Sequence, residues 1–365
     1  MKVIIVGAGL SGLSTAIALR KFIPASQPLE VKIYDNINPA TGQATEQVTP
    51  QVRTSRLGAG LGLQANGLRV LEDLDPALKQ RVYAAGFPCT RFTWKTASDW
   101  LLGHEYVDVL PISRPLLINC LYETLPSDSV IQKKIAKVVT RQGRKPVVQF
   151  EDGSPDETAD LVVGADGIRS TVRHDLFGDD EKYRPQYVGI CAVGQEQAAL
   201  LQLRERHGNW TDPLISQCLE NAHLDNVYPI FVMPDLPYWG RDGCVLVGDA
   251  AHALPPRSGQ GASQAFEDGE ALALLLAGYL EREHDAGDAI SRSILGLFEV
   301  RAPRVNGIKA DALRWKEPKM PMSWLRTAGL YISLFILVRV RRVLNIFTRR
   351  DLWNVRDAVS KYLAQ

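Results

Sequence analysis

The first 35 residues, MKVIIVGAGLSGLSTAIALRKFIPASQPLEVKIYD (1–35), decide the fold of this chain. A β-branched apolar run at residues 2–6 predicts a buried strand, and the glycine-rich turn after it opens a segment with apolar residues at helical spacing. Residues 30–35 then alternate into a second strand that ends on an acid. Strand, turn, helix and strand in this order predict the first unit of an α/β dinucleotide-binding fold.

Three glycines in the turn GAGLSG, namely Gly7, Gly9 and Gly12, fit the GxGxxG fingerprint. The fingerprint needs a tight turn, then backbone close enough to touch a pyrophosphate, then close packing of the helix on the strand. The start of the helix supplies N–H donors for the phosphates. Asp35 is a candidate acceptor for a ribose diol, against the alternative of a solvated acid at a strand end. This unit alone does not separate FAD from NAD.

Two longer stretches have a more specific pattern: VVGADGIRSTVR (162–173) and CVLVGDAAHALPPRSGQGASQAFEDG (244–269). They resemble the second and third fingerprints of the group A flavoprotein monooxygenases, the family of para-hydroxybenzoate and salicylate hydroxylases, and within it the fungal secondary-metabolite enzymes. Together with GAGLSG, Asp35 and Arg114, the resemblance spans most of the chain. It implies an α/β fold in which a FAD-binding, Rossmann-like domain of the glutathione-reductase type is joined to a mixed-sheet substrate domain.

The resemblance implies a chemistry that belongs to the cofactor. NADPH or NADH, as a transient reductant, gives hydride to FAD, and O₂ then supplies the oxygen atom that enters a small-molecule substrate. The protein positions these partners and excludes water, and it needs no side-chain nucleophile. No catalytic side chain is therefore assigned from the sequence.

In the later of the two stretches, the resemblance assigns Asp249 to a ribityl hydroxyl of FAD, at the end of a strand predicted over 244–249. Gly261 and Ala262 are expected to meet the pyrimidine edge of the flavin, where a helix predicted over 262–281 begins. His252 has the titration range of a general base. The resemblance instead makes it part of a structural turn.

In the earlier stretch, Asp166 and Gly167 match the DG motif, which in the family shapes the site between the FAD pyrophosphate and the nicotinamide cofactor. The alternative role of Asp166 is to cap the helix that follows. Arg114 matches the arginine before a helix that contacts FAD, and Gly60 matches the loop near the adenosine end. Taken singly, Arg114 would be an ordinary surface charge.

The interval between the two stretches is short. Gly167 and Gly248 are 81 positions apart, noticeably closer than in the family, so several strands of the substrate-covering sheet are expected to be missing. Val193 also stands where many relatives carry an arginine. The expected domains are a discontinuous FAD-binding domain (1–74, 111–180 and 244–285), a shortened substrate region (75–110 and 181–243) and a C-terminal helical region (286–365).

Local patterns predict the remaining elements. They are a long loop over 36–56, a glycine-led segment over 57–74 that closes as a helix, a helix over 115–125, a hairpin of strands 147–152 and 160–164 joined by GSPDET, and a helix-like LLQLRERHG over 200–208.

Composition bears on the partners and the compartment. The 42 Lys and Arg residues nearly balance 41 Asp and Glu residues, so the chain has no general attraction to nucleic acid. The five cysteines are scattered without a CxxC pair, which predicts no metal site and no disulfide framework and favours a reduced compartment. Glycines interrupt the first apolar run and no cleavage site follows, so we expect a cytoplasmic protein.

Residues 325–348, LRTAGLYISLFILVRVRRVLNIFT, contain a dense apolar run. This run, over 328–338, is followed by Arg339, Arg341 and Arg342, and it is shorter than the roughly 20 residues that a membrane span needs. A helix packed across the substrate region is the favoured interpretation. A peripheral membrane contact, with the basic residues at the headgroups, is the alternative.

Three functions fit these observations. The favoured one is a FAD-dependent monooxygenase that hydroxylates or epoxidises an apolar or aromatic small molecule in secondary-metabolite biosynthesis. A second is a flavoenzyme of another reaction class, such as a dehydrogenase, reductase or halogenase, because fold alone does not fix function; the lysine-bearing motif expected of a halogenase is not found. A third is a truncated, weakly active flavoprotein. The sequence carries no signal for the oligomeric state.

Overall fold

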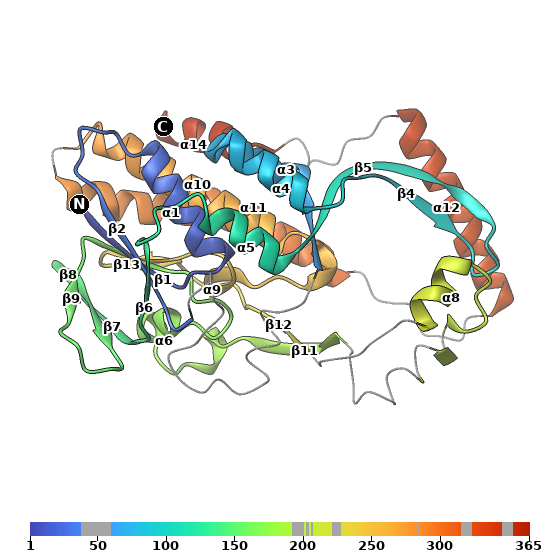
Figure 1. The fold of residues 1–365 in the computed structure, drawn as a ribbon, viewed down its shortest axis with the longest axis horizontal. Coiled ribbons are helices and arrows are strands. Elements are labelled where there is room, and N and C mark those ends of the chain that lie inside the picture. Colours follow the sequence, from blue (N-terminus) through green and yellow to red (C-terminus); the bar gives the residue numbers. More distant parts are fainter. Residues whose placement is uncertain are drawn as a thin grey trace.

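The structure, a computed structural model, describes residues 1–37, 60–191, 201, 204–205, 207–220, 228–283, 285–314, 323–344 and 353–365. Figure 1 shows an α/β body, in which long helices lie along a central sheet, and a smaller lobe at one end. The lobe contains a long hairpin and one of the C-terminal helices. The fold class expected from the sequence is confirmed.

A six-stranded sheet forms the centre of the body, with the order β13-β14-β10-β1-β2-β6. Its strands are β1 (Lys2–Val6), β2 (Glu30–Asp35), β6 (Val130–Gln132), β10 (Leu161–Gly164), β13 (Gly240–Arg241) and β14 (Cys244–Leu246). All neighbouring strands are parallel except β13 and β14. The strand order reverses at β1, because β2 lies on one side of it and β10 on the other. In sheets of this kind, ligands bind at the carboxyl ends of the strands that flank such a switch point.

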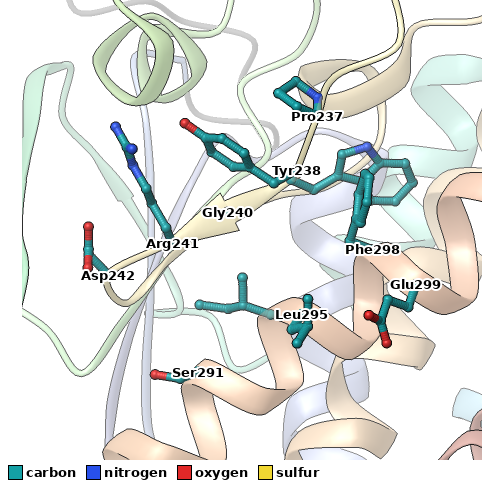
Figure 2. Close-up of a pocket in the computed structure, with 11 residues that line it drawn as sticks. Pro237, Tyr238, Gly240, Arg241, Asp242, Ser291, Leu295, Phe298 and Glu299 are labelled. Carbon is teal, nitrogen blue, oxygen red and sulfur yellow. The ribbon is translucent and has the colours of Figure 1, made fainter.

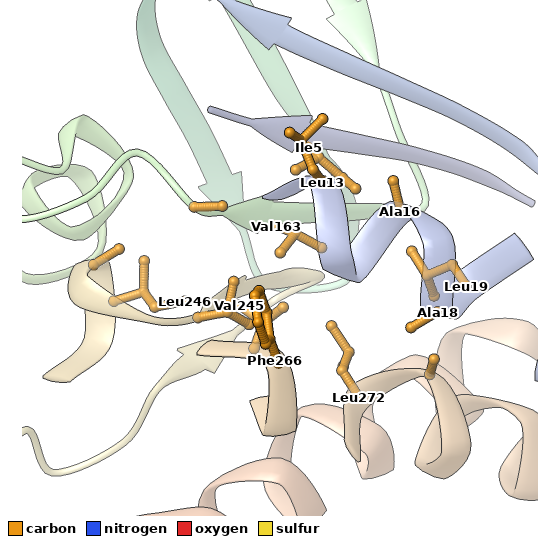
Figure 3. Packing of buried hydrophobic residues seen from close by; sticks show 14 of the residues in the cluster. Ile5, Leu13, Ala16, Ala18, Leu19, Val163, Val245, Leu246, Phe266 and Leu272 are labelled. Atoms are coloured by element: carbon orange, nitrogen blue, oxygen red, sulfur yellow. The ribbon is translucent and has the colours of Figure 1, made fainter. Parts of the chain in front are cut away.

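Helices cover the sheet and supply most of the core. The main ones are α1 (Leu10–Phe22), α3 (Ala65–Leu74), α4 (Pro76–Ala85), α5 (Arg114–Tyr122), α10 (Gly261–Leu280), α11 (Ala286–Arg314) and α14 (Val355–Leu363). Helices α1 and α10 approach closely, since a Cβ at Gly269 would lie 2.8 Å from Thr15 Oγ1. Figure 3 shows buried side chains of β1, β10, β14, α1 and α10 meeting between these helices and the sheet.

The lobe in Figure 1 grows out of a second, three-stranded sheet with the order β3-β5-β4. Its strands are β3 (Gly60–Gln64), β4 (Cys89–Lys95) and β5 (Leu101–Ser113), and helix α12 (Trp324–Leu344) packs on β5. Smaller elements are β7 (Ile135–Arg141), β8 (Arg144–Phe150), β9 (Glu157–Thr158), α6 (Thr171–Phe177), η1 (Glu181–Tyr183), β11 (Gln186–Cys191), α8 (Pro213–Glu220), β12 (Tyr228–Val232), α9 (Asp249–His252) and η2 (Pro256–Ser258). Among the residues that the structure describes, no helix is both long and apolar enough to cross a membrane.

One predicted pairing is wrong. Strands 147–152 and 160–164 do not form a hairpin, because β8 pairs with β7 and β9 whereas β10 runs parallel between β1 and β14. The burial patterns give the reason. β10 is buried on both faces, as a central parallel strand must be, but β8 alternates between buried and half-buried residues.

Other predicted bounds need smaller changes. The strand expected over 244–249 ends at Leu246, and Asp249 is the first residue of α9. Helix α10 agrees with the expected 262–281 to within one residue at each end, and α5 with the expected 115–125 less closely. Most of the loop expected over 36–56, much of the segment 200–208 and Val193 lie outside the described residues.

Helix α14 is held to the body by an ion pair with a buried partner. Arg356 Nε lies 2.9 Å from Glu270 Oε1 of α10 and 3.2 Å from Asp73 Oδ2 at the end of α3. Glu270 is fully buried. Its Oε2 has no hydrogen-bond partner among the described residues. Burial raises the pKa of Glu270 to about 7.

This pKa predicts how stability changes with pH. The pKa of Glu270 lies above its ordinary value of 4.5, so the folded chain holds the proton more tightly than the unfolded chain. Its contribution is present below about pH 4.5 and is lost as the pH rises through about 7, by up to about 3 kcal/mol. We expect Glu270→Gln to remove this slope in urea unfolding followed between these pH values. The control Glu281→Gln, at the exposed end of the same helix, should keep it, and a wild-type slope in Glu270→Gln would contradict the assignment.

Candidate cofactor site

The glycine turn after β1 has the geometry that its fingerprint predicts. Gly7 has φ +107°, and a Cβ there would lie 2.5 Å from the carbonyl oxygen of Ala165. A Cβ at Gly12 would clash with the carbonyl oxygen of Gly7. Gly9 is different, because a Cβ there would meet nothing within 4 Å. Two of the glycines are therefore required by packing, and the third borders open space where backbone can approach a ligand.

Asp35 lies at the carboxyl end of β2 and is buried. Its Oδ2 accepts a hydrogen bond from Ala8 N–H at 2.7 Å, and its Oδ1 accepts one from Ile37 N–H at 2.9 Å. The carboxylate thus fixes the glycine turn. The contact with a ribose hydroxyl stays a prediction.

Most helices that begin beside predicted site residues have no side-chain cap, and α6, which follows the DG motif, is the exception. The cap is absent for α1 at Gly9, α5 at Ser113, α9 at Gly248 and α10 at Gln260. By contrast, side chains cap α4, α6 and α14 at Asp75, Ser170 and Asn354. The first N–H groups of a helix have no partner within the helix. At α1, α5, α9 and α10 no side chain of the described residues caps these donors, so they fit an anionic ligand such as a dinucleotide.

Asp249 presents an exposed carboxylate at the first turn of α9. It makes no hydrogen bond or ion pair with any of the described residues. The residue before it, Gly248, has φ +59°, and a Cβ there would clash with the hydroxyl of Ser11 in α1. This close approach places Asp249 beside the glycine turn. A free carboxylate there fits the predicted ribityl contact.

The loop before α10 is fixed by amide side chains. Gln260 is buried, and its Oε1 accepts from Asn66 Nδ2 and from Gln264 Nε2, each at 3.0 Å. Its Nε2 donates to Gln64 at the end of β3. A Cβ at Gly261 would meet nothing within 4 Å, so the side of the loop assigned to the flavin is open. Ala262, the other residue assigned to the flavin edge, is half-buried at the start of α10.

The DG motif forms a helix cap. Asp166 Oδ1 accepts from Ser170 Oγ at 2.5 Å, and its Oδ2 accepts from the N–H groups of Thr171 and Val172 at 2.7 and 3.2 Å. Gly167 has φ +77° and open space at its Cβ position. The capping role of Asp166 is therefore observed, and its role toward a cofactor stays a prediction.

Gly60 and Arg114 lie side by side. Gly60 begins β3 and pairs with Ser113, the residue before Arg114. The Nε of Arg114 is buried without a hydrogen-bond partner among the described residues. A buried guanidinium N–H without a partner is costly. It fits a position that a cofactor oxygen would fill.

A buried charge network behind the site was not predicted. Asp268 accepts from Gly248 N–H at 2.9 Å, His252 Nε2 at 2.6 Å and Arg301 Nε at 2.9 Å. Burial alone would raise the pKa of Asp268, but the adjacent His252 and Arg301 charges outweigh it and lower the pKa. His252 is buried against Trp239, with the ring centroids 4.8 Å apart. Its place inside the turn matches the structural role expected for it.

Glu267 extends this network. It pairs with Arg301 Nη1 at 2.5 Å and with Arg304 Nε at 2.9 Å, and it accepts from Asn66 Nδ2 at 2.6 Å. Glu267 and Asp268 stand inside the quoted stretch 244–269, where two adjacent acids in an apolar helix are a visible signal of a buried ion pair. Arg301 lies 33 residues beyond Asp268 and has no such signal.

Two cavities lie outside this set of residues. One, of about 390 Å³, opens between β13 and α11 and is lined by Tyr238, Arg241, Leu295 and Phe298 among others (Figure 2). The other, of about 310 Å³, follows the DG motif around Arg169 and Phe177. Neither is lined by a predicted site residue, so neither is assigned to FAD. In the part of the chain that the structure describes, no three His, Cys, Asp or Glu side chains are grouped to hold a metal ion.

The residues present fit FAD. The uncapped starts of α1, α5, α9 and α10 can bind phosphate and ring oxygens. Asp249 can accept a hydrogen bond from a ribityl hydroxyl, and the Nε–H of Arg114 can donate one to a cofactor oxygen. When bound, FAD supplies the transfer of electrons from a nicotinamide and the reaction with O₂. The protein residues bind and orient it.

Comparison with known proteins agrees with this arrangement. A family model described as "NAD(P)-binding Rossmann-like domain" matches residues 5–67, and one described as "FAD binding domain" matches residues 237–289. The chain is 24% identical to 6-hydroxynicotinate 3-monooxygenase of Pseudomonas fluorescens, over 89% of this chain and 92% of that protein. It is 25% identical to 6-methylsalicylate 1-monooxygenase of Aspergillus terreus, over 89% of each chain.

Among solved structures, the fold is similar to HpxO of Klebsiella pneumoniae complexed with FAD and uric acid. The TM-score is 0.70 at 17% identity, with 100% of this chain and 97% of that chain covered. The alignment to the Pseudomonas enzyme runs over 396 residues, more than the 365 of this chain. It therefore contains gaps on the side of this chain, as a shortened chain requires.

Two measurements distinguish the ligand-binding role assigned to Asp249 from the structural role assigned to His252. We expect Asp249→Ala to weaken FAD binding roughly ten- to hundredfold, because it loses a charge-assisted hydrogen bond worth about 1.5–3 kcal/mol. The stability of its FAD-free form should be unchanged, since the carboxylate has no protein partner in the described structure. We expect His252→Ala to lower that stability by roughly 3 kcal/mol, because the buried carboxylate of Asp268 loses a hydrogen-bond donor.

The two readouts are FAD titration by fluorescence quenching and urea unfolding of the FAD-free protein. Equal losses of FAD affinity in both variants at matched stability would contradict the roles assigned to these residues.

Proposed function

We propose a reaction and a substrate class for this chain, which is a FAD-dependent monooxygenase of the group A aromatic-hydroxylase type. It hydroxylates or epoxidises an apolar or aromatic small molecule, with O₂ as co-substrate and NADPH or NADH as reductant. The observation that carries the proposal is the group of uncapped helix starts around the free Asp249 carboxylate. This group faces the switch point between β1 and β10, where a dinucleotide is expected to bind.

The names of the relatives support the substrate class. Two of them are named for aromatic acids, 6-hydroxynicotinate and 6-methylsalicylate. A role in secondary-metabolite biosynthesis is the setting we propose, from the resemblance to fungal enzymes of that kind. The bacterial relative is about as similar to this chain as the fungal one, so the similarity supports the reaction more directly than it supports this biological setting.

In this proposal, the sheet β3-β5-β4 forms one wall of the substrate site. Gln64 connects that sheet to the cofactor loop, because its Nε2 donates to the carbonyl oxygen of Gly259 at 3.3 Å. Val109 of β5 pairs with Gln64 in the sheet. A substrate bound against this part of β5 would therefore lie next to the loop that is assigned to the flavin edge. The cofactor loop and the substrate wall are positioned by the same side chain.

The cover over this site is small. Between β10 and β13, the only strands among the described residues are β11 and β12, which form a two-stranded sheet. Oxygen transfer to a substrate competes with loss of the oxidising equivalent to water, and a closed site suppresses that loss. The small cover therefore favours a second candidate, a weakly coupled flavoprotein that releases much of the reduced oxygen as hydrogen peroxide.

Anaerobic reduction tests the proposed reaction class. The purified protein should be yellow or should take up added FAD, and NADPH or NADH should bleach its visible absorbance without O₂. Readmission of ¹⁸O₂ with an aromatic acid as substrate should give a product that carries one labelled oxygen atom. Reduction without any labelled product from a panel of aromatic and apolar compounds would instead favour a dehydrogenase or reductase. A folded protein that takes up no FAD would refute the assignment altogether.

The fraction of consumed NADPH that is recovered as hydrogen peroxide tests how well the proposed substrate site is closed to water. We expect a large part of the NADPH consumed without substrate to appear as peroxide in the intact chain. If α12 helps to close the site, Leu334→Asp should raise peroxide in the presence of substrate, because Leu334 stands between Tyr331 and Val338 on the packed face of α12. Ile336→Asp on the exposed face is the matched control and should leave the peroxide yield unchanged. Tight coupling in all three proteins would show that other residues close the site.

A further inference from the structure

Helix α12 uses one face to pack on the lobe hairpin. Val338 is buried, and a Cβ at Gly103 of β5 would lie 2.7 Å from its Cγ1. Nearer the start of the helix, the hydroxyl of Tyr331 accepts from Ala97 N–H at 3.3 Å. Arg339 donates to the carbonyl oxygen of Leu102. These contacts fix which side of α12 faces the protein.

The opposite side of α12 is exposed and apolar. Leu325, Ile332, Ile336 and Val340 recur at intervals of seven and four residues, which places them along one face of a helix. Their exposed fractions are 64%, 60%, 54% and 42%. Large apolar side chains exposed in a continuous row mark a contact surface. None of the described residues covers this face.

The hairpin adds aromatic side chains at the same end of the molecule. Trp100, at the end of the turn after Ala97, is 76% exposed, and Leu101, the first residue of β5, is 54% exposed. Trp324, at the first turn of α12, is also 76% exposed. Tryptophan favours the boundary between lipid headgroups and acyl chains, because its ring is apolar and its N–H is polar.

The charge of α12 favours a lipid membrane over a second copy of the chain as the partner of the exposed face. Residues 324–344 contain four arginines, at 326, 339, 341 and 342, and no acid. A symmetric dimer through this face would bring the same basic helix against itself. A membrane that contains anionic lipids would instead neutralise the arginines and bury the apolar row.

We propose that the exposed face of α12 and the Trp100 turn form a peripheral docking surface for an anionic membrane. The helix lies in the plane of the interface, with Ile332 and Ile336 toward the acyl chains and Arg326 at the headgroups. This placement is consistent with the finding that no described helix could span a membrane. The inference does not depend on the substrate class proposed above.

Co-sedimentation of the full-length, FAD-loaded protein with vesicles tests this surface. The protein should bind vesicles of phosphatidylcholine with phosphatidylserine, and bind vesicles of phosphatidylcholine alone more weakly. Higher salt should weaken only the first, because it screens the arginines. Ile336→Asp should lower partitioning by at least about tenfold, since it removes apolar burial and adds a charge repelled by the lipid. The matched control Leu295→Asp, on α11 with 55% exposure, should bind as the wild type does.

The variant Arg326→Gln measures the electrostatic contribution to vesicle binding. It should lower partitioning roughly fivefold on phosphatidylserine vesicles and leave binding to phosphatidylcholine alone unchanged. The visible spectrum of bound FAD and the circular dichroism of each variant establish that it is folded. Absence of wild-type binding to both vesicles would overturn the proposal. So would a dimer in sedimentation velocity that Ile336→Asp dissociates, since the face would then be occupied by a second copy.

Discussion

A single buried carboxylate, that of Asp268, joins the parts of the chain that make the cofactor site. It accepts hydrogen bonds from the backbone before α9, from His252 at the end of α9 and from Arg301 of α11. A carboxylate withdrawn from water costs several kcal/mol unless its charged partners remain with it. The chain that follows β14, helix α9 and the middle of α11 are therefore placed by one requirement. Because Asp268 also belongs to α10, the same requirement sets where the cofactor loop begins. His252 and Arg301 both donate to this carboxylate. Asp249, the first residue of α9, has no partner among the described residues and can accept from a ligand.

The site divides its work between backbone and side chains. Backbone N–H groups at uncapped helix starts are the predicted contacts of the cofactor, and buried side chains hold those helices in place. Gln260 shows the division most clearly. Its buried amide bonds with Asn66 and Gln264, whereas Gly261 next to it leaves open space. Hydrogen bonds of this kind restrict the loop before a ligand binds, so less binding energy is needed to order it.

The elements that were predicted correctly are those in which apolar residues recur with the period of a strand or a helix. The strands at 2–6 and 30–35 and the helix near 262–281 were predictable to within one residue, because alternation and helical spacing are local signals. The partner of a strand is not a local property. β10 was expected to pair with the strand before it and instead lies between β1 and β14. The cofactor motifs located the loops of the candidate site, but Arg301 was missed, because only the fold brings it to the two acids of α10. Weak patterns over 181–243 gave no reliable bounds for the elements there.

The topology explains how the central sheet keeps its strand order although, among the described residues, the chain between β10 and β13 contributes only the strands β11 and β12. β10 and β14 are neighbours and run parallel, so the chain between them is a crossover connection. The register of β14 against β10 depends on Val162, Val163 and Gly164 and their partners, and not on the length of the connection. Extra strands inserted in this crossover add a cover, and their removal leaves the sheet and its switch point intact. The buried network at Asp268 involves α9, α10 and α11, and Asn66 of α3 joins it through Glu267. Binding of FAD and enclosure of the substrate are therefore separable properties of this fold, and a chain with a short crossover can retain the first while it loses part of the second.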